Sequence, residues 1–135
     1  IAKQKLVENN LCSFTDKKEE INDKEFNLMI SMFYVVNHLT SFKQLRSFLE
    51  LASEKLNKNG LLVFDAWNGI AAIKELIHSF SYDLEHTLWT PFILKEMLNE
   101  YNFDVLEINK SYSVDKRASF KDYKIMYVCK NRGSK

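Results

Sequence analysis

Apolar residues dominate the stretch Phe26–Val36, which reads FNLMISMFYVV and has charged residues before it and Asn37-His38 after it. A near-continuous apolar run of this length is typical of a strand that is buried on both faces of a parallel sheet. Periodicity alone leaves a buried helix open as the alternative. We interpret the run as a strand.

The next segment has the pattern of an amphipathic helix. Ser41 can cap it and Gln44 completes a capping box. Asn59-Gly60 is expected to end it, with Gly60 at positive φ. A second short buried strand, Leu61–Asp65, follows. The apolar stripe of the helix consists of Phe42, Leu45, Leu49, Ala52 and Leu56.

Strand, helix and strand in this order predict a right-handed crossover. We therefore expect Phe26–Met32 and Leu61–Asp65 to be adjacent and parallel. A further helical pattern begins at Ile70, with apolar positions at Ile73, Leu76, Ile77 and Phe80.

The last helical pattern begins at Thr90, which suits an N-cap, with Pro91 in the first turn. Asn102 can take the left-handed conformation that ends a helix. Two strands follow, Phe103–Ile108 and Tyr123–Cys129, and the polar loop between them leaves no room for a crossover helix. They should be antiparallel neighbours. The buried side of the helix comprises Leu94, Met97, Leu98 and Tyr101.

These elements predict an α/β fold with an open, mostly parallel sheet and an antiparallel carboxyl-terminal hairpin, in one domain over residues 1–135. With 46% hydrophobic and 27% charged residues, the composition is that of one soluble globular domain. A net charge of +1 gives no electrostatic case for a nucleic-acid or membrane partner. Cys12 and Cys129 are far apart and the three histidines have no metal-ligand spacing, so we expect no metal, no disulfide framework and a cytoplasmic location.

Short motifs in the chain resemble class I S-adenosylmethionine-dependent methyltransferases. Phe26–Ile30 resembles the family's FDlvi strand, and Leu56–Gly60 its LkpGG turn. Leu61–Asn68, LLVFDAWN, is similar to the following strand in relatives that act on small molecules and activated sugars. Phe14–Asp16 is similar to the f..gD that closes the third strand. The segment from Thr90 to Phe103 resembles the approach to the sixth strand. This sequence departs from the family at Thr15, Asn27, Asn59 and Asn102.

The resemblance implies a Rossmann-like sheet and S-adenosylmethionine as the cofactor. It also implies a glycine-rich loop and an acidic residue on the first two strands, neither of which is present in this sequence. We therefore expect these 135 residues to be an incomplete methyltransferase domain that alone binds the donor weakly or not at all. Ile1, rather than Met, fits a native start upstream.

The resemblance implies that Asp16 accepts a hydrogen bond from the adenine amino group of S-adenosylmethionine. It also implies that Ser31, Met32 and Phe33 lie beside the methionine and adenosine parts of this cofactor. The alternatives are that Asp16 caps the turn after it and that Met32 and Phe33 are core residues. His38 is a candidate general base, because its unperturbed pKa lies near neutrality, although a lone His after a strand also serves as a turn or cap residue.

Tyr34 is the other titratable group at this strand end. Asp65, Trp67 and Asn68 follow the next strand and are expected to form the wall facing the methyl acceptor. His86 and Trp89 come from the segment that closes over the acceptor in relatives. That segment is short here, which favours a small or open acceptor pocket.

The leading hypothesis is methyl transfer to a nitrogen or oxygen of a small polar metabolite, a nucleotide-linked sugar among the candidates. A non-catalytic, methyltransferase-like module that binds a partner protein is the alternative, and a homodimer is left open. A nicotinamide-dependent dehydrogenase fits less well, because the sequence has no GxGxxG motif and the sheet of such an enzyme does not end in an antiparallel hairpin.

Overall fold

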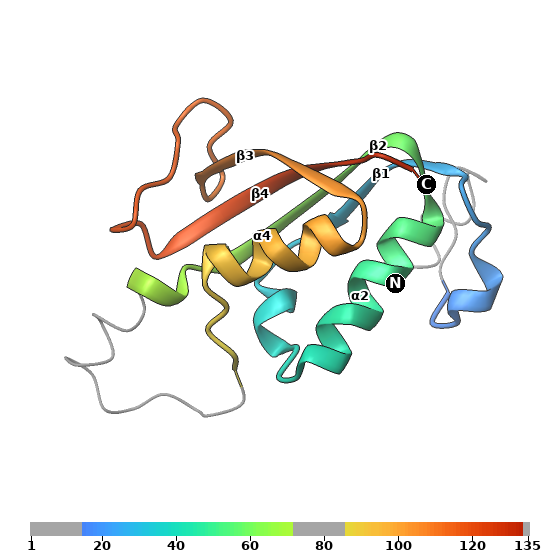
Figure 1. Ribbon diagram of the computed structural model, residues 1–135, viewed down its shortest axis with the longest axis horizontal. Coiled ribbons are helices and arrows are strands. Elements are labelled where there is room, and N and C mark those ends of the chain that lie inside the picture. Colours follow the sequence, from blue (N-terminus) through green and yellow to red (C-terminus); the bar gives the residue numbers. More distant parts are fainter. Residues whose placement is uncertain (1–14, 72–85, 134–135) are drawn as a thin grey trace, which may run out of the picture.

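The computed structural model describes residues 15–71 and 86–133 (Figure 1). The expected helix from Ile70 lies almost entirely outside the described residues, as does Phe14. Residues 15–71 contain η1 (Lys18–Glu20), β1 (Phe26–Ser31), η2 (Val35–His38), α2 (Phe42–Lys55) and β2 (Leu56–Trp67). Residues 86–133 contain α4 (Pro91–Glu100), β3 (Phe103–Lys110) and β4 (Lys124–Asn131).

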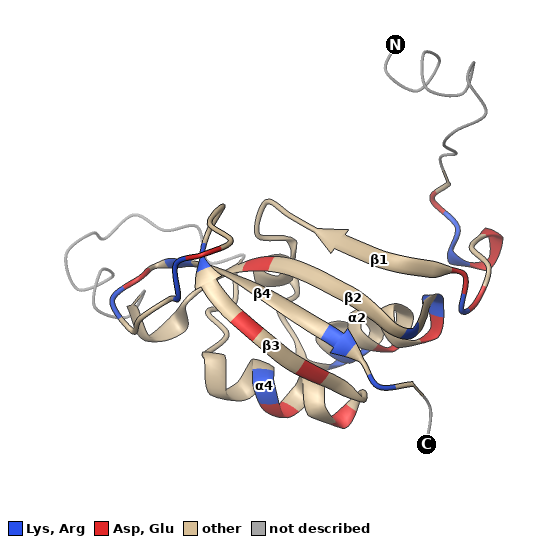
Figure 2. Ribbon diagram, turned by 90° about the horizontal axis from the view of Figure 1, so that it is seen from above, with Lys and Arg blue, Asp and Glu red and all other residues tan. Residues whose placement is uncertain are grey.

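The strands form one sheet in the order β1-β2-β4-β3. β1 and β2 are parallel, whereas β4 runs antiparallel to both β2 and β3. The predicted parallel pair and the predicted antiparallel hairpin are both confirmed. Figures 1 and 2 show α2 and α4 on the same face of this sheet.

The core lies between that face and the two helices. Phe64 on β2 and Tyr127 on β4 stack with ring centroids 4.8 Å apart, and both are buried. Burying each large apolar side chain contributes about 1.5–3 kcal/mol. The helices supply Leu45, Leu49, Ala52, Leu94, Met97 and Leu98 to this core. None of the helices in the described ranges is long and apolar enough to cross a membrane.

Two predicted helix ends have different outcomes. The capping box of Ser41 and Gln44 is present, and Asn102 has a φ of 64° as expected. The expectation for Gly60 is wrong: α2 already ends at Lys55, and positive φ falls on Asn59, at 69°. The cause is strand pairing, because buried Leu56 pairs with Phe26 and so belongs to β2 rather than to the helix.

Gly60 is instead required by a close backbone approach. A Cβ at this position would lie 2.9 Å from the carbonyl oxygen of Asn57 and 3.2 Å from that of Phe26. Any side chain would therefore push β1 and β2 apart where their pairing begins.

The expectation that Phe26–Val36 is buried on both faces is also wrong for the described residues. β1 ends at Ser31 and is an edge strand, paired with β2 alone among the described strands. Phe26, Leu28 and Ile30 are 42%, 49% and 60% exposed. Their apolar character predicted burial, but no described element covers their face of the sheet.

Candidate functional site

The turn after β1 is held in an uncommon conformation. Phe33 and Tyr34 both have positive φ, at 66° and 60°. Their backbone N–H groups donate to the two carboxylate oxygens of Asp65, at 3.1 Å and 2.7 Å. Two consecutive left-handed residues without glycine are costly, and hydrogen bonds to a charged acceptor offset that cost. Asp65 is fully buried, so its carboxylate fixes the turn and faces no open space.

This turn and the end of β2 bring aromatic rings together. The Tyr34 ring lies 5.5 Å from the Trp67 ring, which is also 5.7 Å from Tyr123 and 5.0 Å from His86. The rings of His38 and His86 are 4.3 Å apart. We call these five residues the strand-end cluster. It lies beyond the carboxyl ends of two parallel strands, where open α/β sheets bind ligands.

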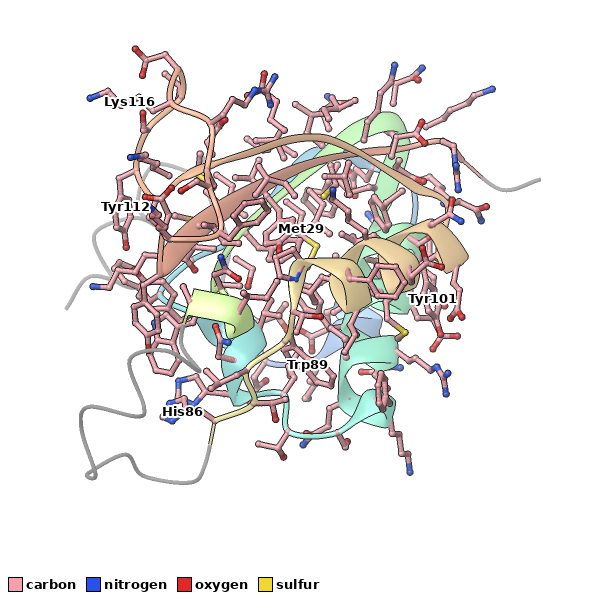
Figure 3. The ribbon with its side chains drawn as sticks, turned by 60° about the vertical axis from the view of Figure 1, so that its left-hand side comes forward. Met29, His86, Trp89, Tyr101, Tyr112 and Lys116 are labelled. Atoms are coloured by element: carbon pink, nitrogen blue, oxygen red, sulfur yellow. The ribbon has the colours of Figure 1, made fainter. Side chains whose placement is uncertain are left out.

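The segment between β3 and β4 and the first residue of β4 add further side chains to this cluster. The ammonium of Lys124 lies 5.7 Å from the centre of the Tyr34 ring. A hydrogen bond to Tyr34 raises the pKa of Tyr112, a side chain that is 65% exposed. In Figure 3, Tyr112 and His86 both lie at the left-hand end of the molecule, and Tyr101 lies at the other end.

Sequence reasoning missed Tyr112, Tyr123 and Lys124. They belong to the site because β2 pairs with β4 in the register that sets Trp67 opposite Lys124. In the sequence, the tyrosines merely lie beside a polar loop, and that pattern does not reveal the register between β2 and β4.

Asn68 and Trp89 serve as scaffold. Asn68 is 2% exposed; its side chain donates to the carbonyl of Asp122 and accepts from the N–H of Ile70, both at 3.1 Å. Trp89 is 4% exposed and donates its ring N–H to the carbonyls of Val36 and Leu39. Both side chains are buried, and their hydrogen bonds hold segments that border the cluster.

The residues expected to hold the donor fall into two places. Ser31 ends β1, Met32 is partly buried, and Phe33 is 79% exposed, so these three lie together beside the strand-end cluster. Asp16 lies in an exposed segment before β1, and that segment is tied to the end of α2 by a hydrogen bond from Lys55 to Ile21. Ile21 in that segment lines a pocket with Phe26, which begins β1, whereas Ser31 ends that strand about 20 Å away.

A separate groove of about 540 Å³ runs between the start of α4 and the β3–β4 segment, with Phe92 and Phe120 on its walls. Within the described residues, no group of three or more His, Cys, Asp or Glu side chains could hold a metal ion. The candidate site is therefore the strand-end cluster together with the turn after β1.

The sequence matches no protein-family model and no curated protein sequence. Solved structures do match. An S-adenosylmethionine-dependent methyltransferase from Clostridium acetobutylicum superposes with a TM-score of 0.75 at 15% identity, over 98% of this chain and 70% of that one. The CcbJ methyltransferase from Streptomyces caelestis has a TM-score of 0.69 at 11% identity, over 93% and 65%. The N-methyltransferase NodS from Bradyrhizobium japonicum has a TM-score of 0.51 at 15% identity, over 78% and 50%. The chain therefore has the fold of class I S-adenosylmethionine-dependent methyltransferases.

Proposed function

We propose that this protein takes part in S-adenosylmethionine-dependent methyl transfer to a nitrogen or oxygen of a small polar metabolite. The observation that carries the proposal is the position of the strand-end cluster, beyond the carboxyl ends of the parallel strands β1 and β2 in a methyltransferase fold. A nucleotide-linked sugar is one candidate acceptor, and the nitrogen option is supported by the likeness to an N-methyltransferase.

The turn after β1 suits the donor. Phe33 presents an exposed ring, and its backbone cannot relax while Asp65 holds the N–H groups of Phe33 and Tyr34. A rigid turn with an exposed aromatic face can orient a flat nucleoside at little entropic cost. Ser31, Met32 and Phe33 would hold the donor, which supplies a methyl group on a sulfonium for in-line displacement.

The strand-end cluster suits the acceptor. In-line transfer requires the acceptor atom to be aligned and, for a hydroxyl or ammonium, to lose a proton. His38 is exposed and is the candidate base, because histidine is the side chain that most often accepts the proton in such steps. Tyr34 and Trp67 provide flat surfaces against which a small ring can pack.

The 135 residues alone should hold the donor weakly. Their three glycines, Gly60, Gly69 and Gly133, are isolated, so no glycine-rich loop is available for the methionine end of the donor. Activity is therefore best tested on the protein expressed from its complete gene.

The test uses donor with a labelled methyl group and a panel of small amines, alcohols and nucleotide-linked sugars. We expect label to enter one class of nitrogen or oxygen acceptor. His38→Ala should lower turnover at neutral pH by about 10²–10⁴-fold, the usual range for a general base. Lys43→Ala, an exposed position on α2, is the matched control and should leave turnover unchanged. Absence of transfer to every acceptor would contradict the proposal, and full activity of His38→Ala would remove His38 from its assigned role.

A further inference from the structure

Asn37 is a fully buried polar residue that joins three separate segments at the strand-end cluster. Its side-chain oxygen accepts from the backbone N–H of Trp67 at 2.9 Å, and its side-chain nitrogen donates to the carbonyl of Thr87, also at 2.9 Å. Its own carbonyl accepts from the N–H of Thr87 at 2.7 Å, and its N–H donates to the carbonyl of Tyr34 at 2.9 Å. The partners of the polar groups of Asn37 thus lie in the turn before η2, at the end of β2 and in the segment before α4.

The neighbours of these partners are the cluster residues themselves. Asn37 precedes His38, and Thr87 follows His86, so the two hydrogen bonds between residues 37 and 87 align the backbones from which both imidazoles project. The 4.3 Å separation of the two rings follows from this alignment. The third partner, Trp67, is the ring that also contacts His86.

We propose that Asn37 is a positioning residue that sets the His38–His86 pair against Trp67. The inference rests on the proposed function for its catalytic meaning, and on the hydrogen bonds of Asn37 for its geometry. The role needs a carboxamide, because both a donor and an acceptor must be presented from one short side chain. A buried aliphatic group would leave the N–H of Trp67 and the carbonyl of Thr87 unsatisfied.

Asn37→Asp removes the side-chain donor and keeps the side-chain acceptor, without changing the shape of the side chain. A carboxylate still accepts from the N–H of Trp67, but it has no proton to donate and faces the carbonyl oxygen of Thr87. We therefore expect the amide of Trp67 to stay protected from hydrogen exchange while the segment carrying His86 moves away. The nuclear Overhauser effect between the His38 and His86 ring protons should then be lost.

Asn131→Asp is the matched control. Asn131 is equally buried, and its side chain likewise donates to backbone carbonyls, those of Leu56 and Asn57, while accepting from the N–H of Gly133. These partners lie where β2 begins, at the opposite end of that strand from Trp67. The control therefore carries the same chemical change and a comparable loss of thermal stability, but it should keep the His38–His86 signal.

The experiment is solution NMR of the full chain. Loss of the ring–ring signal in Asn37→Asp, with the signal kept in Asn131→Asp, is the expected result. If Asn37→Asp does not fold, Asn37→Ser, which is too short to reach both partners, should give the same loss together with roughly tenfold faster exchange of the Trp67 amide. Retention of the signal in the folded Asn37 variant, or its equal loss in Asn131→Asp, would overturn the proposal. Because the sample contains neither a methyl donor nor a methyl acceptor, this result does not depend on whether methyl transfer is confirmed.

Discussion

Tyr34 donates its backbone N–H to the carboxylate of Asp65 over 2.7 Å, and this bond joins the turn after β1 to the end of β2. The second carboxylate oxygen accepts from Phe33. Asp65→Ala should therefore lower the free energy of unfolding by about 2–4 kcal/mol, because two hydrogen bonds to a buried charge are lost and the left-handed turn is left without support. Urea denaturation measures the change.

Asp104→Ala is the control for that experiment. Asp104 is exposed and pairs with Arg132 on the surface, so its loss should cost less than about 1 kcal/mol. Equal, small losses in the two variants would show that Asp65 does not hold the turn.

Phe33→Gly should stabilise the protein while weakening donor binding. Glycine removes the cost of positive φ, about 1–2 kcal/mol, but adds entropy to the unfolded chain, so a net gain of about 0.5–1 kcal/mol is expected. The exposed ring contributes little packing to offset this gain. Asn59→Gly, at another left-handed position, should leave donor binding unchanged. A Phe33→Gly protein with unaltered donor affinity would exclude the ring from the donor subsite.

Tyr112 should titrate above its ordinary range, and Tyr34→Phe should reverse the shift. The hydrogen bond to Tyr34 is the largest cause of the raised pKa of Tyr112, ahead of burial. Since that pKa is raised in the folded state, the contact stabilises the protein below about pH 10 and is lost as pH rises through the folded-state value. Tyrosine ring signals followed by NMR against pH provide the measurement.

Tyr127 is the internal control for that titration, because burial raises its pKa independently of Tyr34. Its signals should respond identically in the wild type and in Tyr34→Phe. An unchanged Tyr112 midpoint in the variant would mean that the two hydroxyls do not interact in solution.

Gly69→Ala should destabilise the chain by about 1–3 kcal/mol, the usual cost of adding atoms to a packed site. A Cβ at this position would lie 2.7 Å from the carbonyl oxygen of Leu88 and 3.0 Å from that of Trp89. The segment carrying His86 would have to move. Thermal denaturation measures the loss, and an unchanged midpoint would show that this segment accommodates the methyl group freely.

The strand pairing could be predicted from sequence because connection length and content decide it. A full helix lies between β1 and β2, whereas none lies between β3 and β4. The caps at Ser41 and Asn102 could also be predicted, because each depends on residues adjacent in the chain. Gly60 was misassigned because Leu56 pairs with Phe26, a contact that no local pattern encodes.

The candidate site was predictable only in part, because some of its residues come together through contacts between distant parts of the chain. Tyr34 and His38 follow β1, Trp67 ends β2, and all three were found by position. Tyr112 and Tyr123 join them through the register of β4, and Asn37 acts through Thr87, a partner fifty residues away in the chain. The role expected for Asp65 at the acceptor wall required an open carboxylate, which the structure instead directs at the turn.

An NMR titration of the 135-residue chain with S-adenosylmethionine tests the donor subsite itself. We expect amide shift changes concentrated at Ser31, Met32 and Phe33, with a dissociation constant on the order of millimolar, equivalent to about −4 kcal/mol. The amides of Asn131 and Phe92, remote from the turn after β1, should not respond. Saturation at micromolar donor, or shift changes centred on the groove beside Phe92 rather than at Ser31, Met32 and Phe33, would contradict this assignment of the donor subsite.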